Sequence, residues 1–82
     1  MTNKEFEELN SMKEILQSAI TKEEEAYQFY LRARQCARTP VESEMFTQLA
    51  AQEAQHKKVL EDQLAEIDAQ FDIDQALSYD VS

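Results

Sequence analysis

Glu53 and His56 are the residues of this chain best suited to binding a metal ion. They stand three positions apart in the run Glu53-Ala-Gln-His56, and His56 is the only histidine. On a helix, residues three apart lie on one face, so the carboxylate and the imidazole can reach the same ion. Glu23, thirty residues before Glu53, is a third candidate ligand. Carboxylate oxygens stabilise Fe(III) and imidazole also suits Fe(II), so this set favours iron, although zinc or manganese could bind it as well.

The composition predicts an all-α chain. Its 82 residues include no Gly, one Pro and no Trp, whereas Glu, Gln, Ala, Leu and Lys are common. These are strong helix formers, and the composition supplies none of the turn residues that β-hairpins need. A chain of this length is enough for one small domain, so residues 1–82 are predicted to form a single domain.

Charge and cysteine content exclude several classes of function. The formal net charge of −9 argues against binding to nucleic acid or to an anionic membrane surface, and it is compatible with the passage of cations. The single cysteine, Cys36, excludes an internal disulfide and a Cys-x-x-Cys metal site. Met1 is followed by a charged stretch, without a signal peptide or a transmembrane run, so the expected compartment is the cytoplasm.

Capping signals predict where the two main helices begin. Ser11 and Glu14 have the spacing of a capping box, so the first helix is predicted over 11–38. Thr39 suits the N-cap of a second helix, which is predicted over 40–69. Two following residues support this start, Pro40 at the first helical position and Glu42 in a second capping box.

A short third helix is predicted over 73–79, with Asp72 or Asp74 as its cap. The short connection around Thr39 makes the two long helices antiparallel neighbours. The expected fold is therefore all-α, an antiparallel two-helix hairpin plus a short C-terminal helix.

Both long helices carry an apolar stripe that polar residues interrupt at its middle. The stripe of the first helix consists of Met12, Leu16, Ala19, Glu23, Ala26, Tyr30 and Ala33. That of the second consists of Phe46, Leu49, Glu53, His56, Leu60, Leu64, Ile67 and Phe71. A buried carboxylate is costly unless it is paired or bound to a metal, so the interruptions indicate a functional group of residues. Glu24, one step off the stripe, is expected to face solvent.

The three polar residues are predicted to lie at one level of the hairpin. Glu23 precedes Thr39 by sixteen residues, while Glu53 and His56 follow it by fourteen and seventeen. At about 1.5 Å of rise per residue, Glu53 and His56 each lie within roughly 3 Å of the level of Glu23. This coincidence does not follow from the capping signals, and it predicts that the three side chains meet.

A single hairpin leaves most of its apolar stripe exposed to water, so the chain is expected to self-associate. A second copy related by a two-fold axis would complete a four-helix bundle. Its centre would hold two copies each of Glu23, Glu53 and His56. Four carboxylates and two imidazoles are the ligand set of the di-iron carboxylate bundles, so two iron ions per subunit pair are expected.

The same residues carry a resemblance to a known family. Glu23-x-Glu25-Ala26-x-x-Phe29-Tyr30, with Phe46-x-x-Leu49-Ala50-x-x-Glu53-x-x-His56, resembles the rubrerythrin branch of the ferritin-like superfamily. Within that branch, a single hairpin with a short C-terminal helix is most similar to the encapsulated ferritins. Those proteins build a ferroxidase centre between two subunits and assemble into rings inside an encapsulin shell.

The resemblance implies roles for five residues. Glu23, Glu53 and His56 would be the metal ligands, Tyr30 would lie beside them, and Glu25 would lie on an acidic approach to the site. The implied activity is ferroxidase, the oxidation of Fe(II) to Fe(III) for iron storage or detoxification. The implied location is the cytoplasm, inside an encapsulin compartment.

Two alternatives remain open at the level of the sequence. One is another enzyme of the same branch, a di-iron protein that reduces peroxide. The other is a non-catalytic helical oligomerisation module, in which hydrogen bonds between Glu23, Glu53 and His56 would fix the register of a coiled coil.

Overall fold

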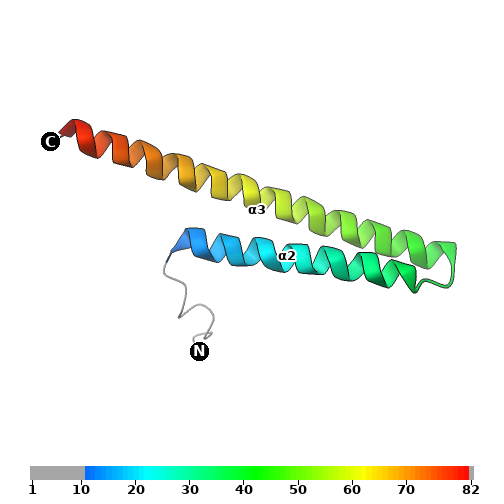
Figure 1. The fold of residues 1–82 in the computed structure, drawn as a ribbon. Coiled ribbons are helices and arrows are strands. Elements are labelled where there is room, and N and C mark those ends of the chain that lie inside the picture. The colour runs from blue at the N-terminus through cyan, green and yellow to red at the C-terminus, as the bar shows by residue number, and fades with distance from the viewer. Residues whose placement is uncertain (1–10, 82) are drawn as a thin grey trace, which may run out of the picture.

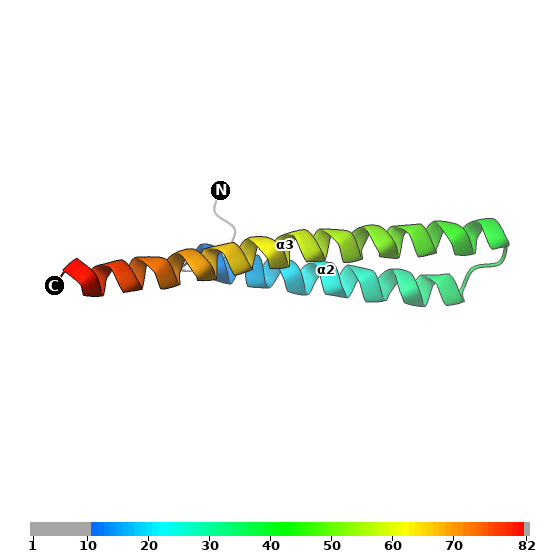
Figure 2. The same cartoon turned by 90° about the horizontal axis from the view of Figure 1, so that it is seen from above.

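Two antiparallel helices make up the described part of the chain. The computed structural model describes residues 11–81, with side chains for residues 11–70. Helix α2 spans Met12–Gln35 and helix α3 spans Pro40–Val81, and no strand occurs within this range. The helices lie side by side along the length of α2, and a short loop joins them at one end (Figures 1 and 2). The predicted all-α hairpin is therefore confirmed.

Helix α2 begins where its capping signal predicts. Ser11 has extended backbone angles, φ −154° and ψ 158°, and its Oγ accepts a hydrogen bond from the backbone N–H of Glu14 at 3.2 Å. The helix ends at Gln35, three residues before the expected end. The backbone N–H of Cys36 donates to the carbonyl of Ala33 at 2.9 Å, which tightens the last turn and closes the helix.

Helix α3 also begins at its predicted cap. Thr39 Oγ1 accepts a hydrogen bond from the backbone N–H of Glu42 at 3.1 Å. The Glu42 carboxylate in turn accepts from the backbone N–H of Arg38 at 2.9 Å. Pro40 occupies the first helical position, where it has no N–H to leave unsatisfied.

The predicted short helix over 73–79 is wrong as a separate element. Helix α3 continues without a break to Val81 and is 42 residues long. Asp72 and Asp74 can cap a helix, but a new helix starts only where the preceding one ends, and no Gly or Pro after Pro40 favours such an end. The C-terminal part of α3 consequently extends past the start of α2 (Figure 1).

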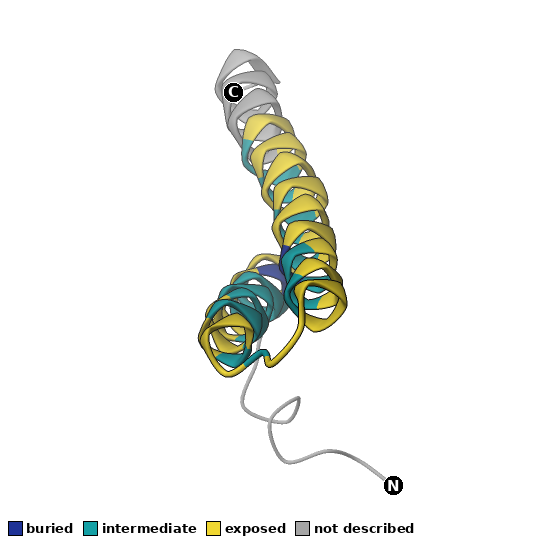
Figure 3. Cartoon of the chain, turned by 90° about the vertical axis from the view of Figure 1, so that its right-hand side faces the viewer, coloured by how far each residue is buried: buried dark blue, intermediate teal, exposed yellow. Residues whose placement is uncertain are grey.

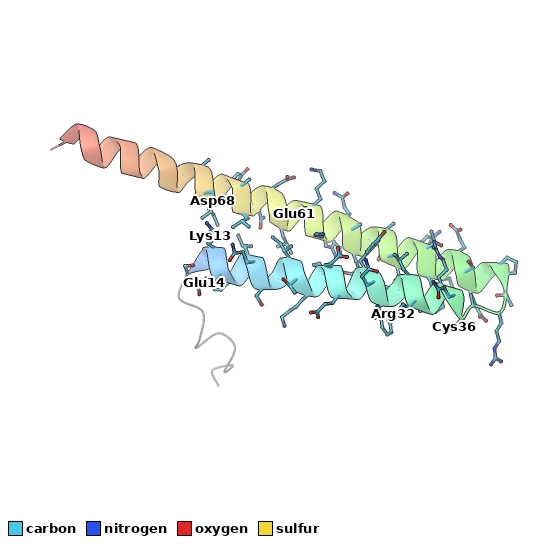
Figure 4. The ribbon with its side chains drawn as sticks, viewed as in Figure 1. Lys13, Glu14, Arg32, Cys36, Glu61 and Asp68 are labelled. Carbon is cyan, nitrogen blue, oxygen red and sulfur yellow. The ribbon has the colours of Figure 1, made fainter. Side chains whose placement is uncertain are left out.

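Three polar contacts between the helices define their register. They are Lys13–Asp68 at 3.1 Å, Glu24–Lys57 at 2.8 Å and Arg34–Thr47 at 3.4 Å. In each pair the two residue numbers add up to 81, so the pairing is continuous from one end of the hairpin to the other. We call this row of contacts the polar seam. The Lys13–Asp68 pair is at its open end (Figure 4).

The hairpin has almost no core of its own. Among the side chains of residues 11–70 only Leu16 and Ala50, at 8% and 3% exposed, are buried. The inner faces of the two helices are mostly half-buried (Figure 3). Five large apolar side chains are exposed: Met12, Phe29, Val41, Met45 and Val59. Within the described residues, neither helix is long and apolar enough to cross a membrane.

Candidate metal centre

Glu23, Glu53 and His56 converge at the middle of the hairpin. The Nδ1 atom of His56 lies 3.6 Å from Glu23 Oε2 and 3.7 Å from Glu53 Oε2. Each residue offers one ligand atom, and the three atoms lie within 4.8 Å of one another. The convergence predicted from the residue count on either side of Thr39 is confirmed. Within the described residues, this is the group of carboxylate and imidazole side chains that could hold a metal ion.

The three side chains differ in their exposure to solvent. Glu23 and Glu53 are 26% and 20% exposed, so both carboxylates are largely shielded. The side chain of His56 is 59% exposed, although it continues the apolar stripe of α3. The imidazole therefore stands at the rim of the group, with Nδ1 near the two carboxylates and most of the side chain exposed to solvent. It is available to a group that approaches from outside the hairpin.

The pKa of Glu23 is raised above its ordinary value of 4.5. The largest cause is the adjacent carboxyl of Glu53, which favours the protonated form of Glu23 through a hydrogen bond. Burial and the charge of Glu53 act in the same direction, whereas His56 opposes them. Two carboxylates this close repel each other in the absence of a cation. Proton sharing relieves the repulsion in part, and a bound metal ion would relieve it fully.

One carboxylate oxygen of the group lacks a hydrogen bond in the hairpin, although His56 Nδ1 lies 3.6 Å from it. Glu23 Oε2 is buried and accepts no hydrogen bond from the described residues. A buried acceptor without a partner is destabilising, so such groups are uncommon in folded proteins. A cation between Glu23, Glu53 and His56 would satisfy this oxygen directly.

The distances from His56 Nδ1 to the two carboxylates fit coordination of a single transition-metal ion. Two donors bound to one ion at about 2.1 Å are at most about 4.2 Å apart. The two separations from His56 Nδ1, 3.6 and 3.7 Å, lie within that limit. Two carboxylates and one imidazole suit iron, but three donors leave a large part of its coordination sphere open. Two carboxylates and one imidazole are half the number of donors found in the ligand set of di-iron carboxylate bundles.

An ion pair beside the group is an unpredicted feature. Glu24 was expected to face solvent, but its Oε1 lies 2.8 Å from the Nζ of Lys57 on the other helix. Its Oε2 accepts a hydrogen bond from Gln28 Nε2 at 2.8 Å. Lys57 and Gln28 lower the pKa of Glu24, and Glu24 raises the pKa of Lys57. The sequence gives one signal for this pair, because Glu24 and Lys57 each follow a predicted ligand directly.

Tyr30 and Glu25 lie away from the three converging side chains within one hairpin. The half-buried ring of Tyr30 packs edge-to-face on Phe29, with ring centroids 5.4 Å apart and planes at 76°. Tyr30 is two helical turns from Glu23, about 10 Å along the axis. Glu25 is exposed, and two positions from Glu23 correspond to about 200° around the helix. Their roles beside the metal and on its approach remain predictions.

Comparison with known proteins assigns most of the chain to one family. The family model described as Rubrerythrin matches residues 14–79, a range that includes Glu23, Glu53 and His56. No curated protein matches the chain significantly, and neither does any solved structure.

Proposed function

The chain belongs to the rubrerythrin family, and from that premise we propose that it is a ferroxidase whose di-iron site forms between two copies of the hairpin. The observation that carries the proposal is the convergence of Glu23, Glu53 and His56 around a buried carboxylate oxygen that has no hydrogen bond. A di-iron carboxylate site is consistent with both the donor set and the family. Iron storage or detoxification would be the biological use of this activity.

The exposure of His56 supports a site shared between two subunits. One hairpin contributes two carboxylates and one imidazole, and a two-fold axis at this point doubles the set. The two imidazoles would then reach the ions from opposite sides of the bundle. Because the side chain of His56 is more exposed than those of Glu23 and Glu53, it is free to make that contact.

The unburied stripe is further support for a homodimer. Met12, Glu23 and Tyr30 follow one another at helical spacing, so they lie on one face of α2. Met12 is 61% exposed, and its neighbours on this face are mostly only half-buried. We call this surface, with His56 on α3, the open face. Two open faces packed together would form the core that one hairpin lacks, in a four-helix bundle.

Each ligand has a distinct part in the proposed reaction. Glu53 would bridge the two metal positions or bind one of them, Glu23 would be a terminal or bridging carboxylate, and His56 a terminal nitrogen ligand. Two Fe(II) ions enter as substrate and each gives up one electron to dioxygen or peroxide. The carboxylates neutralise the increased charge of Fe(III), which then moves on to storage. Glu25 and Tyr30 keep their proposed places at the approach to the site and beside it.

The resemblance to encapsulated ferritins extends the proposal to larger assemblies. In that form, the dimers would join into a ring, inside an encapsulin shell in the cytoplasm. Native mass measurement of the purified chain, alone and with such a shell protein, tests this part separately.

Fe(II) oxidation by the full chain tests the proposed activity. We expect anaerobic loading to bind one Fe(II) per chain, and air to produce the near-ultraviolet absorbance of Fe(III). His56→Ala and Glu53→Ala should lower the initial rate at least about tenfold, since each removes a ligand from both halves of the site. Glu44→Gln, which changes an exposed carboxylate near the loop, is the control and should keep the wild-type rate. Equal rates in wild type and His56→Ala would overturn the proposal.

Family membership also favours a second activity, the reduction of peroxide at the same site. That enzyme would consume peroxide faster than dioxygen and would stop after one round of iron oxidation. A ferroxidase instead turns over a large excess of Fe(II). A chain that binds no metal and still forms dimers would be the non-catalytic oligomerisation module.

A further inference from the structure

We propose that the Glu24–Lys57 ion pair is a positioning device for the metal centre, which holds Glu23 at the correct distance from Glu53 and His56. The inference rests on the proposed function, because it concerns the affinity of the same site for iron. The evidence for it does not depend on family membership. It comes from the contacts of Glu24 and Lys57, which are not metal ligands.

Chain adjacency couples this ion pair to the ligands. Glu24 directly follows Glu23 on α2, and Lys57 directly follows His56 on α3. The Nζ–Oε1 distance of 2.8 Å therefore joins the two backbone segments that carry the ligands from opposite sides. A slide or rotation of α2 against α3 that separates the ligands also moves apart the backbone positions from which this contact is made.

The Glu24 carboxylate is committed to structure on both of its oxygens. Oε1 bonds to Lys57 on α3, and Oε2 accepts from Gln28, one turn further along α2. Glu23 is different, since its Oε2 is buried without a hydrogen bond and its nearest polar neighbour, His56 Nδ1, belongs to the ligand set. Glu24 thus links the two helices, whereas the Oε2 atom of Glu23 remains available to bind a metal ion.

Position distinguishes this contact from the rest of the polar seam. Lys13–Asp68 has the same register but lies about eleven residues, or roughly 16 Å, from the ligand level. It is also longer, at 3.1 Å against 2.8 Å, and more exposed. Surface ion pairs contribute little to stability in general. Lys13–Asp68 is therefore a suitable control for the effect of losing an interhelical ion pair that is far from the ligands.

Precise spacing matters more for metal binding than for the stability of a hairpin. Donor atoms must be held within about 0.5 Å of their working positions, whereas helix packing tolerates larger shifts. Loss of the tether is therefore expected to weaken metal binding more than folding. Groups that support metal ligands from outside typically change affinity by about 10- to 100-fold.

Lys57→Met is a test for which a positioning role and simple electrostatics predict opposite changes in metal affinity. The variant removes a positive charge beside a cation site, so Coulomb's law alone predicts tighter metal binding. Positioning predicts weaker binding, by about tenfold or more. The measurements are anaerobic Fe(II) titration, Co(II) titration followed by its visible absorbance, and thermal unfolding of the metal-free chain.

Lys13→Met is the matched control, since it makes the same change in the pair at the end of the seam. Its Fe(II) and Co(II) affinities should stay within about twofold of wild type, with a thermal midpoint like that of Lys57→Met. The exchanged double variant Glu24→Lys with Lys57→Glu, which restores the pair in reverse, should recover most of the affinity. Unchanged or tighter binding by Lys57→Met would overturn the inference. Wild-type chain that binds neither ion would overturn the proposed function itself.

Discussion

Glu23 and Glu24 are adjacent in the chain, yet their carboxylates have different environments. A cation and an amide occupy both oxygens of Glu24, and the pKa of that carboxyl is lowered. Glu23 lies against a second carboxyl, and its pKa is raised for that reason. The difference arises from about 100° of rotation between neighbouring residues on a helix. That rotation directs one side chain to the seam and the other to the ligand group.

Replacement of Glu23 by Gln should stabilise the metal-free chain while it weakens metal binding. The Gln amide can donate to Glu53 and removes one of the two repelling charges. We expect the free energy of unfolding at neutral pH to rise by about 1 kcal/mol without metal. With saturating Fe(II) the order should reverse, because wild type gains binding energy that the variant lacks. Anaerobic urea denaturation with and without Fe(II) measures both effects.

The difference in unfolding free energy between Glu23→Gln and the metal-free wild type should depend on pH, because the pKa of Glu23 is raised. A carboxyl whose pKa is higher in the folded chain holds its proton more tightly when folded, so its favourable contribution is complete below 4.5. That contribution is lost as pH rises from 4.5 through the raised pKa. The gap between Glu23→Gln and metal-free wild type should therefore widen with pH across this window. A constant gap, or destabilisation by Glu23→Gln in metal-free protein, would contradict the assigned cause.

At the scale of elements, the sequence patterns correctly predicted where the two helices begin and where along them the ligands lie. Ser11 and Thr39 mark the helix starts because each side chain caps a backbone N–H three residues ahead. The level of Glu23 relative to Glu53 and His56 was also predictable, since rise per residue is constant in helices. These two kinds of information suffice for the hairpin and for the convergence of the ligands.

Features that depend on the relative rotation of the helices were not predictable in the same way. The contact between Glu24 and Lys57 requires a side-by-side orientation that no residue pattern specifies. The exposure of His56 depends on which side of the α3 stripe packs against α2. One packed helix leaves the other side of the stripe exposed. The continuity of α3 to Val81 differs from the prediction because Asp72 and Asp74 are compatible with a helix interior as well as with a cap, and no Gly or Pro before them ends the helix.

Thr39→Ala tests the cap that begins α3. The substitution leaves the backbone N–H of Glu42 without the acceptor it has at 3.1 Å. We expect the free energy of unfolding to fall by about 1 kcal/mol. Thr21→Ala is the control, since its hydroxyl bonds to the Gln17 carbonyl inside α2 and caps nothing. Because Ala is a better helix former than Thr, that variant should be unchanged or slightly more stable. Equal losses in the two variants would exclude a capping role for Thr39.

At the scale of the whole molecule, one hairpin buries very little apolar surface. Its shortest dimension is 16 Å, and among the described side chains only Leu16 and Ala50 are buried. A chain of this size folds stably only with further burial, from a partner or another staple. The open face carries the exposed Met12, the half-buried residues of the α2 stripe, and His56. In the proposed dimer, association and metal binding would involve the same surface and would be thermodynamically linked.

Met12→Glu tests this linkage at a position far from the ligands. Met12 is exposed in the hairpin, at the first turn of α2, where an acidic residue is favourable for the helix. The single hairpin should therefore tolerate the change. A dimer formed through the open face would bury the new carboxylate twice, once in each copy. We expect the dimer to dissociate at least about tenfold more readily, and Fe(II) oxidation by dilute protein to fall with the dimer population.

Val41→Glu is the matched control for that experiment, because Val41 is also an exposed apolar residue in the first turn of a helix. It precedes the stripe of α3 and lies outside the open face, so its dimer should keep wild-type affinity. Sedimentation velocity with and without Fe(II) separates the cases. Wild type and Val41→Glu should shift toward dimer when Fe(II) is added, and Met12→Glu should need more protein for the same shift. If Met12→Glu dimerises as tightly as Val41→Glu, the open face is not the interface. If wild type oxidises Fe(II) as a monomer, the three ligands of one hairpin are sufficient, and the second copy has no part in the chemistry.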